Sequence, residues 1–336
     1  FFFFFFKEHY PTNQFEDYGL LIIVITFFCL VIQKCIDSYY LGKINSAYQH
    51  LEKGLNHGIS FSSSKLFEES FKLFPAESLN LYRIRQREKQ ENIEFNREQM
   101  FHIPFQKRGI VSTQRYSIPG HPSLYLGDSI FVCWQETNQP AIKEVYASRF
   151  VNTCDLKIIE IKRTEDLLKE IESLEGLKLS SEIFRFLLLF PLIVGSSIKV
   201  KNRKDTFKPQ YILPQLFFQF ITENKSYIDG IKYFSTRIDY SRIQNVNAYN
   251  YVFPTTTNTN NGYCTSLIRK FKLTLPVLWE YEEMNTSNMT FIGNNPRNDI
   301  TIELYQGRKV PYDWTTFKAI ENALRYPSLK LGHIEQ

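Results

Sequence analysis

The pattern of hydrophobic and polar positions changes character near residue 79. Before that point, apolar residues recur at helical spacing through residues 35–58, and the stretch 18–33 carries no charged residue. Residues 59–77 are typical of a linker that leads into a short amphipathic helix, which Pro75 ends. Residues 1–79 are therefore predicted to be a helical N-terminal region.

The uncharged stretch at 18–33 allows two interpretations. A membrane-spanning helix needs about 20 apolar residues, and shorter runs are more often buried helices, so a buried helix is favoured and a membrane anchor is the alternative. Glu16 and Asp17 precede the stretch, whereas Lys34 and Lys43 follow it. If the stretch does span a membrane, the lysines on its C-terminal side place the rest of the chain in the cytoplasm. Both interpretations predict a cytoplasmic main domain.

From residue 79 onwards, short segments of strand and helix periodicity alternate. The predicted strands are residues 79–86, 110–118, 123–127, 144–151, 155–161, 228–237 (a turn leading into a strand) and 271–281. The predicted helices are residues 129–136 with Asp128 as N-cap, 164–177 with Thr164 as N-cap, and 211–224. Residues 180–200, interrupted by Pro191 and Gly195, are predicted to form buried helix and strand, and 88–102 and 255–262 to be polar loops. Because no regular βαβ repeat occurs, the pattern predicts the α+β class.

Composition and charge narrow the classes of function. The 336 residues are 43% hydrophobic and 16% aromatic, which is enough for a sizeable core. The net charge of +5 is spread along the chain, and a nucleic-acid-binding domain more often concentrates its basic residues, so no specific nucleic-acid partner is predicted. The basic segment 199–208 is a candidate patch, although a solvated loop is the favoured interpretation. The cysteines and histidines lack metal-ligand spacing, and the odd cysteine count argues against a disulfide framework, so a reducing compartment fits.

Three short motifs carry a resemblance to a known family. They are "LYRIR" at 81–85, "TQRYSIPG…SLYLG…CWQE" at 113–136 and "IDGIKYFS" at 228–235, in that order. Together they resemble the RES domain family, which is named for its Arg, Glu and Ser; the corresponding residues of this chain are Arg83, Glu136 and Ser235. The resemblance covers residues 80–282, leaves residues 283–336 as a C-terminal extension, and is greatest to a longer subgroup found in Bacteroidetes-type bacteria.

This resemblance implies a fold, an activity and a partner. RES domains have a fold similar to that of ADP-ribosyltransferases. Several are toxins of bacterial toxin–antitoxin pairs, whose partner is an Xre-type antitoxin protein. They deplete NAD by cleaving it with phosphate or with water. The chain is accordingly expected to be an NAD phosphorylase or NAD glycohydrolase, with NAD as substrate and without a metal.

The chemistry of NAD cleavage is compatible with a single carboxylate. Most glycosidases need two, one of which protonates the leaving group. Nicotinamide leaves from a cationic ring and departs as a neutral molecule, so no acid is required. Glu136 could hold a ribose hydroxyl and stabilise the positive charge that develops on the sugar, and Glu136 and Arg83 are the predicted catalytic residues.

The remaining predicted residues would bind the dinucleotide. Arg115, which Tyr116 follows, could join Arg83 in binding the two phosphates, because a guanidinium offers paired donors that lysine lacks. Tyr125 could stack on the nicotinamide or adenine ring. Ser235 could orient the ribose through its hydroxyl.

Two departures from the family pattern and two other functions belong with this prediction. The family often has Gly where this chain has Gln114, and small residues where it has Trp134, so a differently shaped pocket is expected.

The first alternative function is mono-ADP-ribosyl transfer to a macromolecule. The second is an inactive module that binds NAD or a protein, with the N-terminal helices as its interaction or membrane-targeting part.

Overall fold

The chain folds into two compact units that interleave along the sequence. The structure is a computed structural model, and it describes residues 15–57, 71–87, 95–223, 228–246, 248–257, 259–280, 299–326 and 329–334. One unit draws on residues 1–70 and 162–220, and the other on residues 71–161 and 221–336. All six predicted site residues belong to the second unit.

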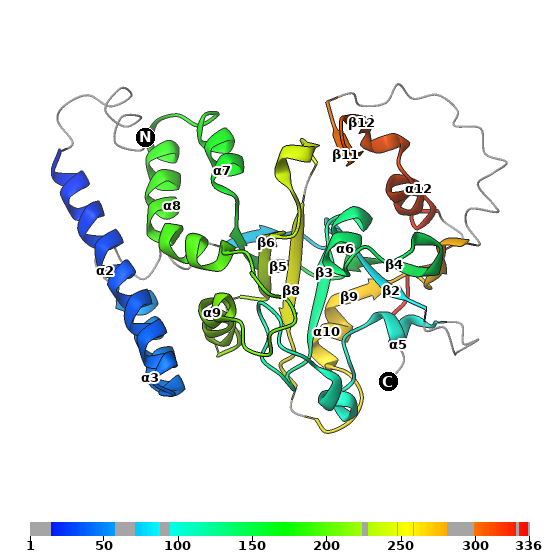
Figure 1. Ribbon diagram of the computed structural model, residues 1–336, viewed down its shortest axis with the longest axis horizontal. Coiled ribbons are helices and arrows are strands. Elements are labelled where there is room, and N and C mark those ends of the chain that lie inside the picture. Colours follow the sequence, from blue (N-terminus) through cyan, green and yellow to red (C-terminus); the bar gives the residue numbers. More distant parts are fainter. Residues whose placement is uncertain are drawn as a thin grey trace. The chain divides into compact units, whose positions relative to one another are not determined.

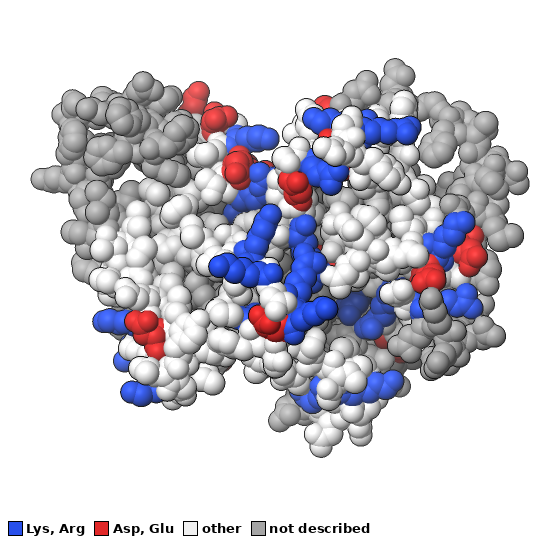
Figure 2. All heavy atoms as spheres, viewed as in Figure 1, with Lys and Arg blue, Asp and Glu red and all other residues white. Residues whose placement is uncertain are grey.

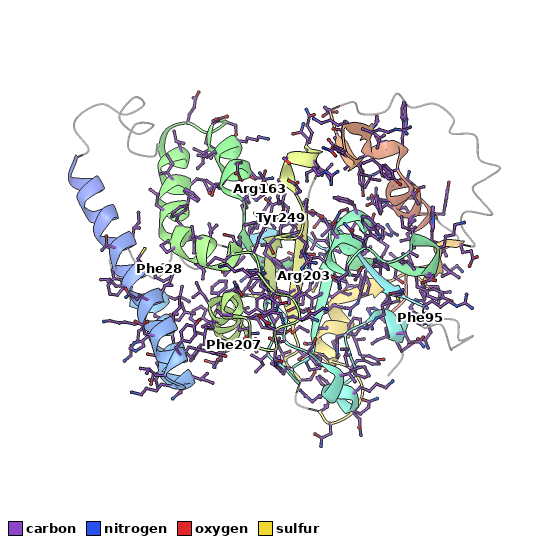
Figure 3. All side chains as sticks on the ribbon, in the orientation of Figure 1. Phe28, Phe95, Arg163, Arg203, Phe207 and Tyr249 are labelled. Atoms are coloured by element: carbon purple, nitrogen blue, oxygen red, sulfur yellow. The ribbon has the colours of Figure 1, made fainter. Side chains whose placement is uncertain are left out.

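The first unit is helical (Figure 1). Its helices are α2 (Phe15–Tyr40), α3 (Ile44–His57), α7 (Thr164–Ile171), α8 (Gly176–Ser197) and most of α9 (Ile212–Glu223). Helix α2 packs against α3 and α8. The aromatic ring of Phe207, which is labelled in Figure 3, stacks on Tyr39 at 6.2 Å and meets the edge of Tyr40 at 6.1 Å, where α2 ends. Aromatic contacts therefore join the end of α2 to Phe207.

Helix α2 contains the uncharged stretch 18–33. It ends before Gly42, whose φ of +73° is the left-handed conformation that commonly terminates a helix. The single helical pattern over 35–58 is thus two helices. No helix in the described part of the chain combines the length and the apolar character that a membrane crossing requires.

Two predictions for the segment 162–200 are wrong. The predicted helix 164–177 ends at Ile171, and its N-cap residue is Arg163, which caps without a side-chain bond. The predicted helix and strand in 180–200 form one helix, α8, which passes through Pro191. Proline removes one backbone hydrogen bond but does not always end a helix. Gly195 lets α8 approach α9 closely, since a Cβ at this position would lie 2.4 Å from the Leu213 side chain.

The second unit is built on a mixed nine-stranded sheet. The strand order is β1-β5-β6-β8-β3-β2-β4-β10, with β9 paired to β4. Strands β5 and β6 run parallel, and the other recorded pairs are antiparallel. The strands are β1 (Phe71–Phe74), β2 (Asn80–Gln86), β3 (Ser123–Gly127), β4 (Val145–Asn152), β5 (Leu156–Ile161), β6 (Gly230–Phe234), β8 (Tyr249–Pro254), β9 (Phe271–Leu273) and β10 (Val277–Leu278). The α+β prediction is confirmed.

A smaller sheet and several short helices complete the second unit. Strands β12 (Arg308–Pro311), β11 (Thr301–Tyr305) and β7 (Ile243–Gln244) pair in that order. The helices are α5 (Arg97–Met100), α6 (Ile130–Glu136), α10 (Thr265–Lys270) and α12 (Thr316–Ala323). One cluster of buried residues, which includes Leu81 and Leu124, lies on one face of the large sheet, and a second, which includes Tyr82 and Ile130, lies beneath α6.

Several sequence predictions for this unit are confirmed and others are wrong. The strands predicted at 79–86, 123–127, 144–151, 155–161 and 228–237 and the helices at 129–136 and 211–224 are present. Residues 71–74 form strand β1 instead of a helix ended by Pro75; residues 59–70 of that prediction lie outside the described residues. The predicted strand 271–281 is two short strands, and α5 lies within the predicted loop 88–102. The predicted strand 110–118 is an irregular segment that contains one isolated bridge, between Gln114 and Ser117.

Candidate functional site

Helix α6 places Glu136 at its C-terminal end. The first turn is capped by Ser129, whose Oγ accepts a hydrogen bond from the Val132 N–H at 3.2 Å. The helix packs closely on strand β3, because a Cβ at Gly127 would lie 2.7 Å from the sulfur of Cys133. The prediction that Asp128 caps this helix is wrong, since an Asp128 carboxylate oxygen instead accepts from the Tyr249 N–H of β8 at 3.1 Å.

Both carboxylate oxygens of Glu136 accept hydrogen bonds from buried or half-buried side chains. Oε1 accepts from Ser235 Oγ at 2.7 Å and from Asn250 Nδ2 at 2.8 Å. Oε2 lies 2.9 Å from Arg237 Nε in an ion pair. Ser235 is fully buried and Asn250 is 5% exposed, whereas the side chains of Glu136 and Arg237 are 28% and 26% exposed. The carboxylate is thus held by two buried side chains and stays partly exposed beside Arg237.

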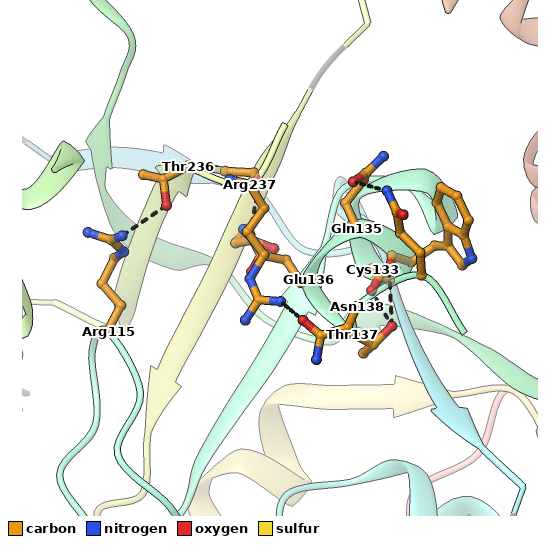
Figure 4. Close-up of polar contacts among 12 residues, drawn as sticks. Arg115, Cys133, Gln135, Glu136, Thr137, Asn138, Thr236 and Arg237 are labelled. Carbon is orange, nitrogen blue, oxygen red and sulfur yellow. Dashed lines mark hydrogen bonds and ion pairs between the residues drawn. The ribbon is translucent and has the colours of Figure 1, made fainter. Parts of the chain in front are cut away.

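The segment after β6 is fixed in place by its own contacts. Tyr240 Oη donates to the Ser235 carbonyl at 3.0 Å, and Arg237 N–H donates to Ser235 Oγ at 3.2 Å. Arg237 Nη1 also donates to Asn138 Oδ1 at 2.6 Å, so Arg237 joins this segment to the turn that follows α6 (Figure 4).

Three tyrosine side chains lie near this carboxylate. The rings of Tyr116 and Tyr233 are 4.5 Å apart between centroids. The Tyr125 hydroxyl lies 3.0 Å from Ser117 Oγ. Burial raises the pKa of Tyr233 well above its ordinary value, and the nearby Tyr125 and Glu136 raise it further. This combination places Tyr125, Tyr116 and Tyr233 in one neighbourhood with Glu136.

Arg115 lies in a turn instead of a strand. The backbone groups of Gln114 and Ser117 bond to each other and close the turn that carries Arg115. The side chain is 8% exposed, and its Nη2 donates to Thr236 Oγ1 at 2.8 Å, as Figure 4 shows. Arg115 therefore contacts the same segment that carries Ser235 and Arg237.

Arg83 comes from the other face of strand β2. Its neighbours Tyr82 and Ile84 belong to the cluster beneath α6, and side chains alternate along a strand. Its Nη1 donates to the Tyr125 carbonyl oxygen at 3.2 Å. Within the described residues, no hydrogen bond or ion pair joins Arg83 to Glu136. Burial lowers the pKa of Arg83 well below its ordinary value, and the charge of Arg85 lowers it further.

The structure thus brings together most of the predicted residues and adds two. Glu136 and Ser235 are in direct contact, Arg115, Tyr116 and Tyr125 lie around them, and Arg83 has separate surroundings. The sequence interpretation missed Asn250 and Arg237. Arg237 follows Ser235 by two residues and could have been considered, whereas Asn250 lies in an otherwise apolar strand "YNYVFP" and its polar character was the available signal.

Trp134 faces the C-terminal part of the chain. Its indole N–H donates to the Pro140 carbonyl at 2.8 Å, and its ring lies 5.2 Å from the ring of Phe317 in α12. Its packing partners include Phe131, at 6.5 Å between ring centroids. The residue is therefore accounted for by packing between α6 and α12.

The C-terminal segment also supports the start of α6. Glu321 Oε1 accepts from the Ile130 N–H at 3.0 Å and from the Tyr312 hydroxyl at 2.7 Å. Strand β11 pairs with β7, which follows the segment of Ser235 and Arg237. Residues 299–326 therefore contact both parts of the chain that form the carboxylate cluster.

Comparison with known proteins gives one relative. The chain is 36% identical over 268 residues to the Bacillus subtilis (strain 168) protein named "Putative toxin YopC". The match covers 77% of this chain and 60% of that protein, so the chain spans less than two thirds of the relative's length. The chain is similar to a protein named as a toxin.

Other comparisons give no match. No family model matches the chain. No solved structure matches it either. The resemblance to RES domains and to ADP-ribosyltransferases therefore stays a prediction.

Charged side chains of both signs occur on the surface. Figure 2 shows Lys and Arg side chains interspersed with Asp and Glu on the face in view. Within the described residues, salt bridges join Lys232 to Glu160 at 2.7 Å and Arg163 to Glu165 at 3.2 Å. Part of the excess positive charge is thus locally compensated.

Proposed function

We propose that the protein splits NAD at the bond between nicotinamide and ribose and that it acts as the toxin of a toxin–antitoxin pair. The observation that carries the proposal is the carboxylate of Glu136, which is held by Ser235, Asn250 and Arg237 beside a group of tyrosines. The similarity to a protein named as a toxin supports the toxin role. An Xre-type antitoxin stays the predicted partner.

The proposed reaction balances without an acid. The bond between the ribose carbon and the nicotinamide nitrogen breaks, and its electron pair neutralises the cationic ring. An oxygen of water or phosphate then bonds to the ribose carbon, which carries positive charge in the transition state, and water loses a proton in this step. All three partners of Glu136 donate to it, so its carboxylate is an acceptor that can stabilise this positive charge.

The geometry supports specific roles for the neighbouring residues. Tyr125 and Arg237 are half-buried, so a ring and a guanidinium are available to a ligand. Ser235 is fully buried and donates to Glu136, so the proposal makes it a positioning residue instead of a ribose contact. Arg115, which donates to Thr236, supports the segment of Ser235; its contact with the phosphates stays a prediction.

Product analysis tests the enzymatic part of the proposal. We expect the purified full-length chain to consume NAD and release nicotinamide, with ADP-ribose as the second product in phosphate-free buffer. A phosphorylated ADP-ribose in phosphate buffer would identify phosphate as the acceptor. Glu136→Gln should lower turnover by about 100-fold or more, because it removes a charge that stabilises the transition state. Glu165→Gln is the control, since Glu165 is an exposed glutamate of the helical unit.

Two outcomes would change the proposal. Folded wild-type protein that leaves NAD intact in both buffers would refute NAD cleavage. Transfer of label from NAD to a protein or nucleic acid would instead support mono-ADP-ribosyl transfer.

Expression in bacteria tests the toxin role. Wild-type protein should lower cellular NAD and arrest growth, whereas Glu136→Gln should do neither at equal protein level. Growth arrest by both proteins, with NAD unchanged, would separate toxicity from the proposed chemistry.

A further inference from the structure

The face of β2 that points away from α6 carries two arginines and a buried serine. Arg83 and Arg85 are two residues apart in the strand, so both side chains lie on this face. Ser148 of β4 is paired with Arg83 in the register, so its side chain lies on the same face. Leu81 also lies on this face and belongs to the buried cluster there.

These three side chains have more donors than acceptors around them. Arg83 Nη1 donates to the Tyr125 carbonyl at 3.2 Å, and Arg85 Nη2 donates to the Phe101 carbonyl at 3.0 Å. Arg85 Nε and Ser148 Oγ are buried and have no hydrogen-bond partner in the described structure. Within the described residues, no carboxylate forms an ion pair with either arginine. A guanidinium offers five donors, so most of this capacity is unused.

Among the described residues, the charged groups that act on Arg83 and Arg85 include no carboxylate. The positive charges of Arg83 and Arg85 act on His102, which accepts from the Cys264 N–H at Nε2 and contacts the Ile103 carbonyl at Nδ1, 2.7 Å away. Burial lowers its pKa to about 4, so the ring is neutral at physiological pH. Burial lowers the pKa of both Arg83 and Arg85, which reflects the cost of two partly buried charges without a counter-ion.

We infer that Arg83, Arg85 and Ser148 form a subsite for a phosphate group. A phosphate supplies several acceptor oxygens and a negative charge, which match two guanidinium groups and a hydroxyl. Both arginines are half-buried, so a ligand can reach them. The subsite lies on the face of β2 opposite to α6, so the inference concerns the binding of a phosphate group. That this phosphate belongs to the dinucleotide or to the inorganic acceptor rests on the function proposed above.

Calorimetric titration of inorganic phosphate and of pyrophosphate into the full-length chain tests the subsite without NAD. Wild-type protein should bind pyrophosphate saturably. Arg85→Gln should weaken this binding by about tenfold or more, because it removes a charge-assisted bond. Ser148→Ala should weaken it by about threefold and leave the melting temperature unchanged or raised, because Ser148 Oγ has no partner to lose. Arg308→Gln, at an exposed position of β12, is the matched control.

The source of the phosphate is decided by competition. In the Glu136→Gln protein, phosphate that displaces NAD assigns the subsite to the dinucleotide. Phosphate that binds together with NAD, and that speeds NAD consumption by the wild type, assigns it to the acceptor. The inference is overturned if folded wild-type protein binds neither anion, or if Arg85→Gln and Ser148→Ala bind as the wild type does. NAD consumption would then remain and support the proposed function alone, whereas anion binding without NAD consumption would refute the proposed function and keep the subsite.

Discussion

Glu136 is the residue on which the candidate site depends, and three neighbouring side chains donate to its carboxylate. Ser235 and Asn250 both bond to Oε1, and Arg237 pairs with Oε2. Two neutral donors fix the orientation of the carboxylate without cancelling its charge, whereas the guanidinium lies on the more exposed side. A cationic ligand centre would share this carboxylate with Arg237 and would meet a rotamer that is already held.

Replacing Asn250 by Asp should shift the pH dependence of NAD cleavage. Asn250→Asp would place a second carboxylate about where the amide now lies, 2.8 Å from Glu136 Oε1. Two carboxylates so close share a proton, which raises one pKa of the pair. Because the proposed mechanism needs an ionised Glu136, the acidic limb of the profile of kcat against pH should move upward by about one unit or more. Steady-state kinetics between pH 5 and pH 9 would measure this shift.

The control for this variant is Asn322→Asp, an exposed position on α12. It makes the same chemical change away from Glu136 and should leave the profile unchanged. An Asn250→Asp protein that is folded and active with an unshifted acidic limb would show that Asn250 does not act on Glu136.

At the residue scale, the sequence motifs named two residues, Glu136 and Ser235, that contact each other in the structure. Glu136 and Ser235 are separated by 99 positions, yet they lie 2.7 Å apart as the resemblance led us to expect. The polar character of Asn250 in an apolar strand was a signal, but its contact with Glu136 could not be predicted, because it depends on the pairing of β8 with β3, which no local pattern specifies. Arg83 is separated from Glu136 because side chains alternate along β2 and Arg83 lies on the face away from α6. Which face of β2 packs on α6 depends on contacts between segments.

The junction between β3 and α6 contains a carboxyl group that is costly to ionise. Burial raises the pKa of Asp128 from 3.8 to about 7, although the Tyr249 N–H opposes the shift, and its Oδ1 is buried without a partner. The folded pKa lies above the unfolded pKa, so the folded state keeps the proton over a range in which the unfolded state has lost it. Stability from this group is therefore present at low pH and is lost as the pH rises from about 4 to about 7.

Asp128→Asn should remove this dependence. We expect the free energy of unfolding of the wild type to fall relative to that of the variant as the pH rises through this range, by up to about 4 kcal/mol before solvent screening reduces it. Urea unfolding at pH 5 and at pH 8 would measure the difference. Asp155→Asn is the comparison, and a pH dependence that is the same in all three proteins would contradict the assignment.

The contact between α6 and α12 should affect both stability and turnover. Phe317 is 2% exposed and packs on Phe131 at 5.4 Å and on Trp134 at 5.2 Å between ring centroids. Phe317→Ala should cost about 3–5 kcal/mol of stability, the usual range for emptying a buried aromatic site. It should also lower kcat more than it changes KM, because α6 carries Glu136. Chemical unfolding and steady-state kinetics would test the two effects.

Two variants delimit this prediction. Phe317→Leu fills more of the same space and should retain most of the stability and turnover. Tyr305→Ala, at a residue that is 76% exposed, should change neither. Loss of stability in Phe317→Ala with unchanged kcat would show that α12 supports the fold and not the position of Glu136.

At the element scale, periodicity located the strands of the large sheet and the helix of Glu136. It failed at 110–118, where alternation without a pairing partner produces a turn held by Gln114 and Ser117. It also failed at Pro191, which lies inside one continuous helix, because a proline does not always end a helix. Both errors concern contacts between segments, which local spacing does not contain.

At the scale of the whole molecule, each unit is formed by two separate stretches of chain. The parallel pair β5 and β6 explains part of this organisation, since parallel strands need a long crossover, and residues 162–220 lie within it. The second unit likewise includes β11, β12 and α12 from the segment that the motifs left unassigned. Motif matching could not include that segment, because its role is to pack on α6 and to pair with β7.

A chain that stops after Glu282 should therefore lose much of the folding stability of the second unit. It would leave the Ile130 N–H and the Tyr82 hydroxyl without Glu321 and Arg325, and it would uncover the face of α6 that packs on Phe317. Phe317, Ile320 and Leu324 are buried, and burial of each such side chain contributes about 1.5–3 kcal/mol. Their sum is comparable with the whole stability of a typical domain, about 5–15 kcal/mol. We expect no cooperative thermal unfolding for this shortened chain, and a chain that stops after Ile334 should melt as the 336-residue chain does. A shortened chain that still unfolds cooperatively and cleaves NAD would show that residues 80–282 form a self-sufficient domain, as the motifs alone predict.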